Sequence, residues 1–218
     1  VPSPLLLRSF LELGARRFIF EGRECGGHVG PRSSFVLWEA MVAELLSAAE
    51  AGQELREVHL LLAGGIGDAR SAAMAVAIAA PLLRLGVKVG VLMGTAYLFT
   101  EEAVRSGAVT ERFQREVLRC ERTVLFETGP GHAIRGLDSP YRQAFDAHRR
   151  ELVAQHKSGD ETRLALELLN VGRLRVASKG VSRVDGELQS LPEETQWQDG
   201  MFMVGQLAAL RDRPLTMS

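Results

Sequence analysis

One pattern, repeated three times, most constrains the fold of this chain: a short apolar strand runs into a glycine-rich loop, and a helix follows. The predicted strands are residues 17–20, 57–62 and 87–92, and the loops after them are residues 21–31, 63–68 and 93–95. Strands that alternate with helices predict parallel βαβ units. We therefore expect an α/β fold whose three loops lie at the carboxyl ends of parallel strands, where α/β proteins bind ligands.

The chain after residue 105 has a different character. Charged segments at 110–121, 139–156 and 160–171 show helical spacing, and 123–127 is a short apolar strand. Residues 172–198 are polar and mixed, which predicts irregular structure, whereas 199–210 has the spacing of a final helix. The predicted organisation is therefore an α/β part at 1–105, a mostly helical extension at 106–198, and a C-terminal helix within 199–218 that packs back on the first part.

Composition excludes several classes of protein. The 26 basic and 27 acidic residues nearly balance, which argues against a non-specific nucleic-acid binder. No apolar run reaches the roughly 18 residues of a membrane span. The two cysteines are too few for a disulfide scaffold and indicate a reducing compartment. We expect a cytoplasmic protein without nucleic-acid or membrane partners.

The first loop carries the strongest chemical signal. Gly26 and Gly27 lack a Cβ, so their backbone can approach a planar or phosphorylated ligand closely. His28 follows them, and an imidazole can act as acid or base near neutral pH. The alternative interpretation of the same residues is a tight turn that carries a surface histidine.

The second and third loops together predict a phosphate site. Gly64 and Gly65 precede a helix, whose N-terminal amides favour a phosphate, and Asp68 is a candidate N-cap. Met93, Gly94 and Thr95 place a small residue and a hydroxyl after the next strand. Alone, each loop also fits an ordinary turn, but together they match the two-loop phosphate cradle of a barrel.

Other reactive residues are weaker candidates. Cys25 is expected to line the pocket wall, with a nucleophilic role beside His28 as the alternative. His132 is the second histidine candidate, for which a loop or interface role is favoured. No set of Cys, His and carboxylate residues has metal-ligand spacing, so we expect no metal.

Three ordered motifs resemble the nitronate monooxygenase (2-nitropropane dioxygenase) family and its relatives, the flavin-dependent enoyl-acyl-carrier-protein reductases. They are EGRECGGHVG at 21–30, AGGIGDAR at 63–70 and MGT at 93–95 with FTEEA at 99–103, and GMFMVGQLAAL at 200–210 looks like the family's C-terminal helix. The resemblance implies the C-terminal part of an FMN-binding TIM (β/α)8 barrel, about its last three βα units, followed by an α-helical extension.

The resemblance also implies roles for these residues. His28 matches the family's catalytic histidine, and Glu21 falls where many members have Gln beside the flavin. Leu92 replaces the usual Gln on the phosphate strand, which is a departure from the family. The implied FMN-binding set is Glu21, Gly26, Gly27, Gly64, Gly65, Met93, Gly94 and Thr95.

Three functions stay open at this point. A nitronate monooxygenase would oxidise alkyl nitronates with O2, whereas an enoyl reductase would use NAD(P)H to reduce thioester-linked enoyl groups. The third is a non-catalytic partial-barrel module. Segments 126–132 and 169–180 look like variants associated with polyketide and polyunsaturated-fatty-acid synthases. Basic residues that could dock an acyl carrier protein are Arg142, Arg149, Arg150, Arg173, Arg175 and Lys179.

The chain is shorter than a complete TIM barrel. The chain starts at Val1 without a methionine, and a full barrel needs about 250 residues, whereas only about three strands are evident here. We therefore expect an excerpt of a longer polypeptide. A partial barrel leaves open sheet edges, so we expect a missing N-terminal half or a second copy to complete it.

Overall fold

The computed structural model describes residues 1–217, which form two compact units. The first unit consists of Val1–Cys25 and Val29–Gly94; the second consists of Gly26–His28 and the chain from Thr95 onward. The boundary expected at residue 105 thus falls within the second unit, and Ser218 lies outside the described residues.

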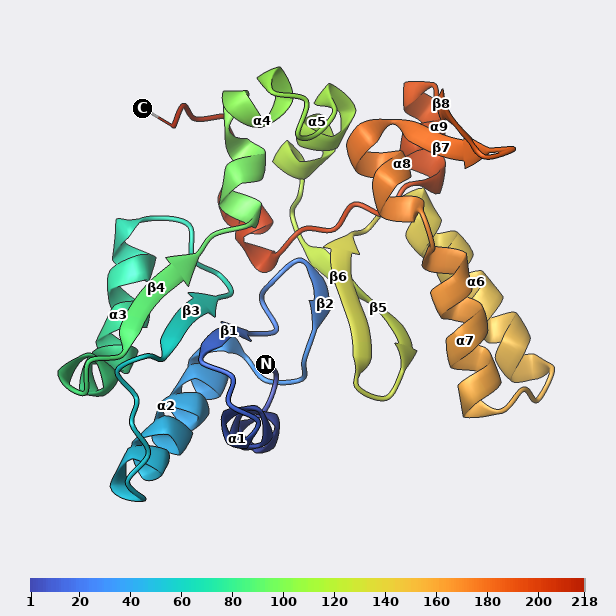
Figure 1. Ribbon diagram of the computed structural model, residues 1–218. Coiled ribbons are helices and arrows are strands. Elements are labelled where there is room, and N and C mark those ends of the chain that lie inside the picture. The colour runs from blue at the N-terminus through green and yellow to red at the C-terminus, as the bar shows by residue number, and fades with distance from the viewer. Residues whose placement is uncertain (218) are drawn as a thin grey trace. The chain divides into compact units, whose positions relative to one another are not determined.

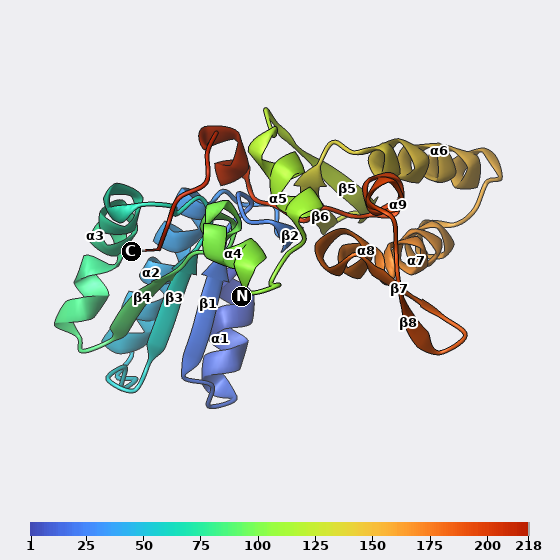
Figure 2. The same cartoon turned by 90° about the horizontal axis from the view of Figure 1, so that it is seen from above.

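The first unit is a three-stranded parallel sheet with helices (Figure 1). Its elements are α1 (Pro4–Glu12), β1 (Arg17–Glu21), α2 (Ser34–Glu50), β3 (His59–Ala63), α3 (Ala69–Arg84) and β4 (Lys88–Leu92). The strands lie in the order β1-β3-β4, side by side in Figure 2. The predicted parallel βαβ units are confirmed.

Only one face of this sheet belongs to the core of the unit. Phe18, Phe20, Leu60 and Leu62 are buried in one hydrophobic cluster with residues of α1, α2 and α3. The side chains that alternate with them point away from this cluster, because successive residues of a strand face opposite sides. Helices therefore cover one face of the sheet, and the other face carries Ile19 and Leu61 in the open, 42% and 37% exposed.

The second unit contains two antiparallel hairpins, a third short strand and several helices. Its elements are β2 (Gly27–Val29, of which Val29 belongs to the first unit), η1 (Thr95–Phe99), α4 (Glu101–Arg105), α5 (Glu111–Leu118), β5 (Thr123–Gly129), β6 (His132–Leu137), α6 (Pro140–Ala154), α7 (Gly159–Asn170), α8 (Arg173–Lys179), β7 (Val181–Val184), β8 (Glu187–Ser190), α9 (Glu193–Asp199) and η2 (Gln206–Leu210). One sheet has the order β2-β6-β5, and β7 pairs with β8 in another.

Two expectations for the second unit are wrong. Residues 172–198 are not irregular, since they form α8, the β7–β8 hairpin and α9. Residues 199–210 are not one helix: α9 ends at Asp199, no helix or strand is present over 200–205, and only the short 3-10 helix η2 follows. This non-helical segment buries Met201, Phe202 and Val204 in two different clusters of the second unit, which a single helical stripe could not reach.

Candidate functional site

The candidate residues of the first unit gather at one edge of its sheet. Glu21 pairs in register with Ala63, and Ala63 pairs with Leu92. Gly64 and Met93 come directly after those strands. The sheet therefore brings the ends of β1, β3 and β4 to the same edge, as the sequence pattern predicts.

Gly64 is held by packing within the first unit. Its φ is 127°, and an added Cβ would overlap the Oγ of Ser34, which is 4% exposed at the start of α2. A Cβ at Gly22 would overlap the same oxygen. Ser34 is fixed in turn by Glu24, whose carboxylate accepts hydrogen bonds from the Ser34 amide at 2.7 Å and hydroxyl at 2.5 Å. The Glu24–Ser34 pair thus shapes the loop, and no pattern in the sequence predicts it.

Gly65 and Gly94 differ from Gly64 because they have room beside them. A Cβ at Gly65 would come no closer than 3.7 Å to Glu24, and one at Gly94 would meet no atom within 4 Å. Among residues 1–217, the amides of Gly65 and Ile66 have no hydrogen-bond partner. These backbone positions can therefore approach a ligand closely and donate to it.

The N-terminus of α3 is closed by its own cap. The Asp68 side chain accepts from the Ser71 amide at 2.8 Å, and Ser71 Oγ accepts from the amides of Gly67 and Asp68 at 3.1 Å each. The capping carboxylate also places a negative charge where a phosphate would lie. Phosphate binding at this edge therefore depends on amides that precede the helix rather than on its first turn.

His28 lies on β2 in the second unit, and its side chain is exposed between two buried neighbours. No hydrogen bond within residues 1–217 engages its ring. An exposed imidazole without a protein partner is accessible to a substrate as a proton donor or acceptor.

Gly26 and Thr95 both contact Gly205, which lies in a segment whose apolar spacing predicts a helix. A Cβ at Gly26 would come within 2.7 Å of the Gly205 backbone nitrogen, and that nitrogen donates to Thr95 Oγ1 at 2.8 Å. Gly27 has a φ of 83°, and Met203 Sδ lies 3.7 Å from the position of an added Cβ. Met203 and Gly205 therefore lie beside predicted site residues. The glycine at position 205 is the one sequence feature that could have indicated this contact.

Cys25 is poorly suited to be a nucleophile. Burial, together with the nearby carboxylates of Glu21 and Glu24, raises the pKa of its thiol to about 12. The thiolate is the nucleophilic form, and it is scarce at neutral pH when the pKa is so high. The expectation that Cys25 is a pocket-wall residue is therefore favoured over the nucleophilic alternative.

His132 lies in the β5–β6 hairpin, away from the glycine loops in sequence. Its Nδ1 is 3.8 Å from Glu167 Oε1 on α7. Both side chains are about half exposed, at 53% and 42%. The contact fits a surface role between hairpin and helix.

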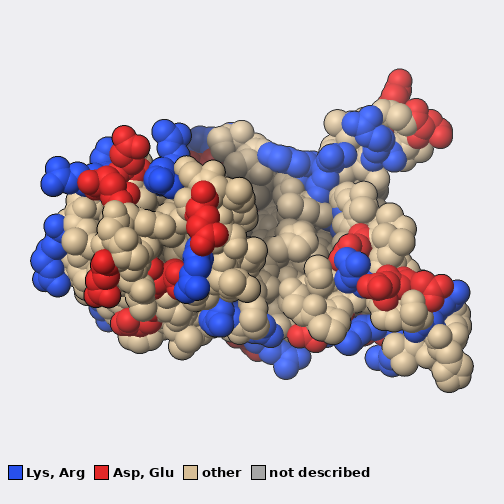
Figure 3. Space-filling model, turned by 60° about the horizontal axis from the view of Figure 1, so that its bottom comes forward, with Lys and Arg blue, Asp and Glu red and all other residues tan. Residues whose placement is uncertain are grey.

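The six basic residues considered for carrier docking fall into two groups. Lys179 donates to the carbonyls of Gly107 and Ala108, and Arg173 lies over the Tyr141 ring, so both are engaged within the second unit. Arg142 pairs with Asp146, whereas the exposed members are Arg149, Arg150 and Arg175. Figure 3 shows basic and acidic side chains intermixed on the face that it presents.

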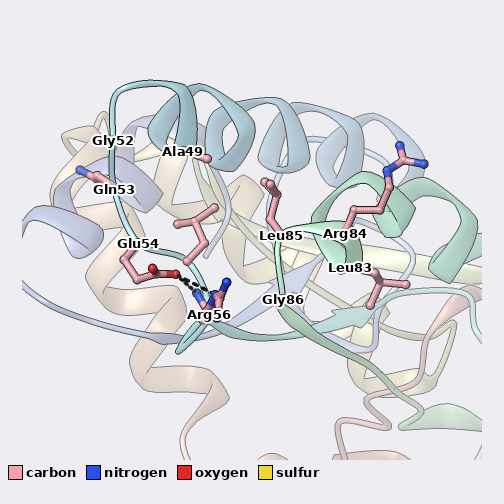
Figure 4. A pocket seen from close by; sticks show the side chains of 10 residues that line it. Ala49, Gly52, Gln53, Glu54, Arg56, Leu83, Arg84, Leu85 and Gly86 are labelled. Atoms are coloured by element: carbon pink, nitrogen blue, oxygen red, sulfur yellow. Dashed lines mark hydrogen bonds and ion pairs between the residues drawn. The ribbon is translucent and has the colours of Figure 1, made fainter.

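A separate cavity of about 640 Å³ opens at the other end of the first unit (Figure 4). It lies where the loops after α2 and α3 lead into β3 and β4, and its lining includes Leu83, Leu85 and the ion pair Glu54–Arg56. None of the predicted site residues lines it. This cavity is therefore distinct from the glycine-loop edge.

Within residues 1–217, no group of three or more Cys, His, Asp or Glu residues is placed to hold a metal ion. The same part of the chain has no helix with the length and apolar character needed to cross a membrane.

Comparisons with known proteins identify a family and several similar chains. A family model described as nitronate monooxygenase matches residues 5–208. A (3aS,4S,5R,7aS)-5-hydroxy-7a-methyl-1-oxo-octahydro-1H-indene-4-carboxyl-CoA dehydrogenase from Mycobacterium tuberculosis is 30% identical over 167 residues, which are 76% of this chain and 39% of that protein.

Two solved structures share the fold. FabK from Thermotoga maritima aligns with a TM-score of 0.65 and 27% identity, covering 99% of this chain and 55% of that chain. A nitroalkane oxidase from Streptomyces ansochromogenes aligns with a TM-score of 0.59 and 19% identity, covering 99% of this chain and 52% of that chain. The chain therefore spans about half or less of the length of these relatives.

Proposed function

Because the chain belongs to the nitronate monooxygenase family, we propose that it is part of an FMN-dependent oxidoreductase that oxidises alkyl nitronates with O2. The observation that carries this proposal is the meeting of three glycine-rich loops at the carboxyl edge of one parallel sheet. His28, exposed and without a protein hydrogen-bond partner within residues 1–217, supplies a reactive side chain from the same stretch of sequence.

We infer further that the first unit corresponds to three consecutive βα units of a TIM barrel. Its strands are parallel, lie in sequence order, and have their helices on one face, which is how barrel units are built. The second unit then follows the last of these strands as a C-terminal extension.

The glycine loops suit a flavin phosphate on two counts. Gly94 has open space beside it, and the amides of Gly65 and Ile66 are available as donors among the described residues. Within the first unit, Gly65 and Gly94 would hold the phosphate. Glu21, exposed at the end of β1, would accept a hydrogen bond from the flavin ring.

The chain's own residues supply position and proton transfer. Bound FMN would accept electrons from the nitronate and pass them to O2. A neutral His28 can take the proton from the α-carbon of a nitroalkane at a ring nitrogen, and the resulting imidazolium then pairs with an oxygen of the anionic nitronate. Cys25 takes no part in this step, because its raised pKa keeps the thiol protonated.

A second candidate is reduction of a thioester-linked enoyl group with NAD(P)H. The observation that favours it is the matching dehydrogenase, whose name describes a carboxyl-CoA thioester. In this reaction His28 would protonate the product or orient the thioester. The exposed cations Arg149, Arg150 and Arg175 would then be available to an acidic carrier protein.

One preparation of the purified chain distinguishes the candidate functions. The chain is mixed with FMN and desalted, and absorbance at about 450 nm then reports whether FMN is bound. Anaerobic bleaching by an alkyl nitronate, without bleaching by NADPH, supports the monooxygenase, whereas the opposite pattern supports the reductase. A chain that retains no FMN supports the third hypothesis, the non-catalytic module, for the isolated chain.

His28→Ala tests the assigned proton-transfer role. We expect retained FMN and a turnover rate lower by about 10²-fold or more, the usual contribution of a general acid or base. His132→Ala, which removes another exposed imidazole, is the matched control and should retain full turnover. Full turnover by His28→Ala would show that the role is assigned to the wrong residue.

Both thiols of the chain are free. Free thiols persist in reducing compartments, which supports the cytoplasm as the proposed place of action.

A further inference from the structure

A buried serine at the glycine-loop edge is held by a carboxylate of the first loop. The Ser34 amide and hydroxyl donate to Glu24 at 2.7 Å and 2.5 Å, and both bonds end on the same oxygen, Oε2. Ser34 is 4% exposed and is the first residue of α2, whose N-cap Ser33 makes no side-chain hydrogen bond. Glu24 therefore caps α2 from the preceding loop and fixes the direction of the Ser34 hydroxyl.

The fixed hydroxyl oxygen sets the positions of two loops. A Cβ at Gly22 or at Gly64 would overlap Ser34 Oγ, so both backbones lie directly against it. The Gly22 amide also donates to the Ala63 carbonyl at 3.0 Å, which joins the loops after β1 and β3. The position of residue 64 therefore depends on where Glu24 holds the serine.

The two available donors of the second loop come directly after Gly64. Among residues 1–217, the amides of Gly65 and Ile66 have no hydrogen-bond partner. The stem of Glu24 supports the same loop, since its Cβ lies 3.7 Å from the position of an added Cβ at Gly65. A donor contributes most to binding when it is already oriented, because ordering it on binding costs free energy. The contacts of Glu24 thus preorganise these two amides.

We infer that Glu24 is a positioning residue of the proposed FMN phosphate site, and that it acts through Ser34 on the amides of Gly65 and Ile66. The inference rests on the proposed function and adds a residue to which that function gives no role. Its contribution is geometric. A carboxylate repels a nearby phosphate, so the hydrogen bonds of Glu24, and not its charge, favour binding.

The geometry specifies which side chains can replace Glu24. One acceptor oxygen is enough, because both Ser34 donors meet at Oε2. Glutamine offers such an oxygen without the negative charge, whereas alanine offers none. The glutamine variant should therefore keep the loop in place and bind FMN as tightly as the unmodified chain, or more tightly.

The test compares FMN with riboflavin, which lacks the phosphate. Flavin fluorescence measures the affinity of the 218-residue chain for each. Glu24→Ala should lower the affinity for FMN by at least about ten-fold and change that for riboflavin by less than about two-fold. Glu24→Gln should not lower either affinity. Equal losses for the two flavins, or a glutamine variant as weak as the alanine variant, would overturn the inference.

Ser34→Ala tests the path from Glu24 to the loop, and it keeps the amide hydrogen bond that caps α2. It should also weaken FMN more than riboflavin. The double variant Glu24→Ala/Ser34→Ala should bind no more weakly than the weaker single variant, and additive losses would contradict a shared path.

Glu54→Ala is the matched control. Glu54 also accepts a hydrogen bond from a backbone amide, that of Arg56 at 2.9 Å, but it lies at the separate cavity (Figure 4). This variant should bind both flavins like the unmodified chain. Circular dichroism confirms that each variant is folded before it is compared.

Inorganic phosphate separates a failure of this inference from a failure of the proposed function. In an amide-resolved NMR titration, phosphate should shift the resonances of Gly65 and Ile66, and Glu24→Ala should reduce these shifts. If no flavin binds but the phosphate shifts depend on Glu24, the proposed function fails and the positioning role stands. If phosphate leaves both resonances unchanged, the positioning role is wrong even where FMN binds.

Discussion

Ser34 shows how a residue can shape a ligand-binding loop without itself being predicted. Its side chain occupies the space that a Cβ would need at Gly22 and Gly64, and Glu24 fixes it there. Glycines of different motifs therefore have different roles. Gly64 avoids an internal clash, whereas Gly94 faces open space.

Substitution of Gly64 should separate these two kinds of glycine. Gly64→Ala adds backbone strain at a φ of 127° and a clash with Ser34, and we expect the free energy of unfolding to fall by about 2–4 kcal/mol. Gly52→Ala is the control: its φ is 88°, but no atom lies within 4 Å, so only the strain of about 1–2 kcal/mol applies. Urea denaturation measures both, and equal losses would contradict the clash.

At the scale of elements, two neighbouring helices of the first unit begin in different ways. Asp68 and Ser71 form a reciprocal capping box at the start of α3. Ser33, at the same position before α2, makes no side-chain capping hydrogen bond. A serine or aspartate at an N-cap is therefore not by itself evidence of a capping bond.

This difference predicts that truncating Asp68 and truncating Ser33 lower the free energy of unfolding by different amounts. Asp68→Ala should lower the free energy of unfolding by about 1 kcal/mol, because amides of the first turn lose their acceptor. Ser33→Ala should change it by less than about 0.5 kcal/mol, since no capping bond is lost. Thermal unfolding of the two variants checks this, and a larger loss for Ser33→Ala would refute the assignment of caps.

The strands and helices of the first unit could be predicted because their signals are local. Continuous apolar runs marked β1, β3 and β4, and glycines marked the turns. The strand β2 was not predicted, because it has only three residues and forms by pairing with β6, which is far away in the sequence. The non-helical run at 200–205 was not predicted for a similar reason, since its apolar residues pack into two separate clusters of the second unit.

The candidate site was predictable only in part. The glycines and His28 stand in recognisable motifs, and parallel strands bring Glu21, Gly64 and Met93 to one edge. The contact of Gly26 with Gly205 joins residues from opposite ends of the sequence. No local pattern reveals such a contact, because it depends on how the whole second unit packs.

At the scale of the whole molecule, the two units have separate hydrophobic clusters. The cluster of the first unit includes Trp38, whose indole donates to the Phe20 carbonyl at 3.2 Å. Trp197 packs against a cluster of the second unit, with its ring 5.3 Å from that of Phe202. The chain's two tryptophans thus report on one unit each.

We predict that the isolated chain does not unfold in a single step. Urea titrations of Trp38→Phe and Trp197→Phe, followed by fluorescence, should give different midpoints. The remaining Trp38 should report the lower one, because the first unit has an open apolar sheet face. Circular dichroism of the unmodified chain is the control and should be biphasic. Coincident midpoints in all three experiments would show one cooperative molecule.

The place of β2 in the β2-β6-β5 sheet also has a consequence for synthesis on the ribosome. Chains are made from the N-terminus, so His28 is made about a hundred residues before its neighbouring strand, His132–Leu137. The strand Gly27–Val29 therefore stays unpaired until His132–Leu137 has been made. His28 therefore reaches its final position long after it has been synthesised.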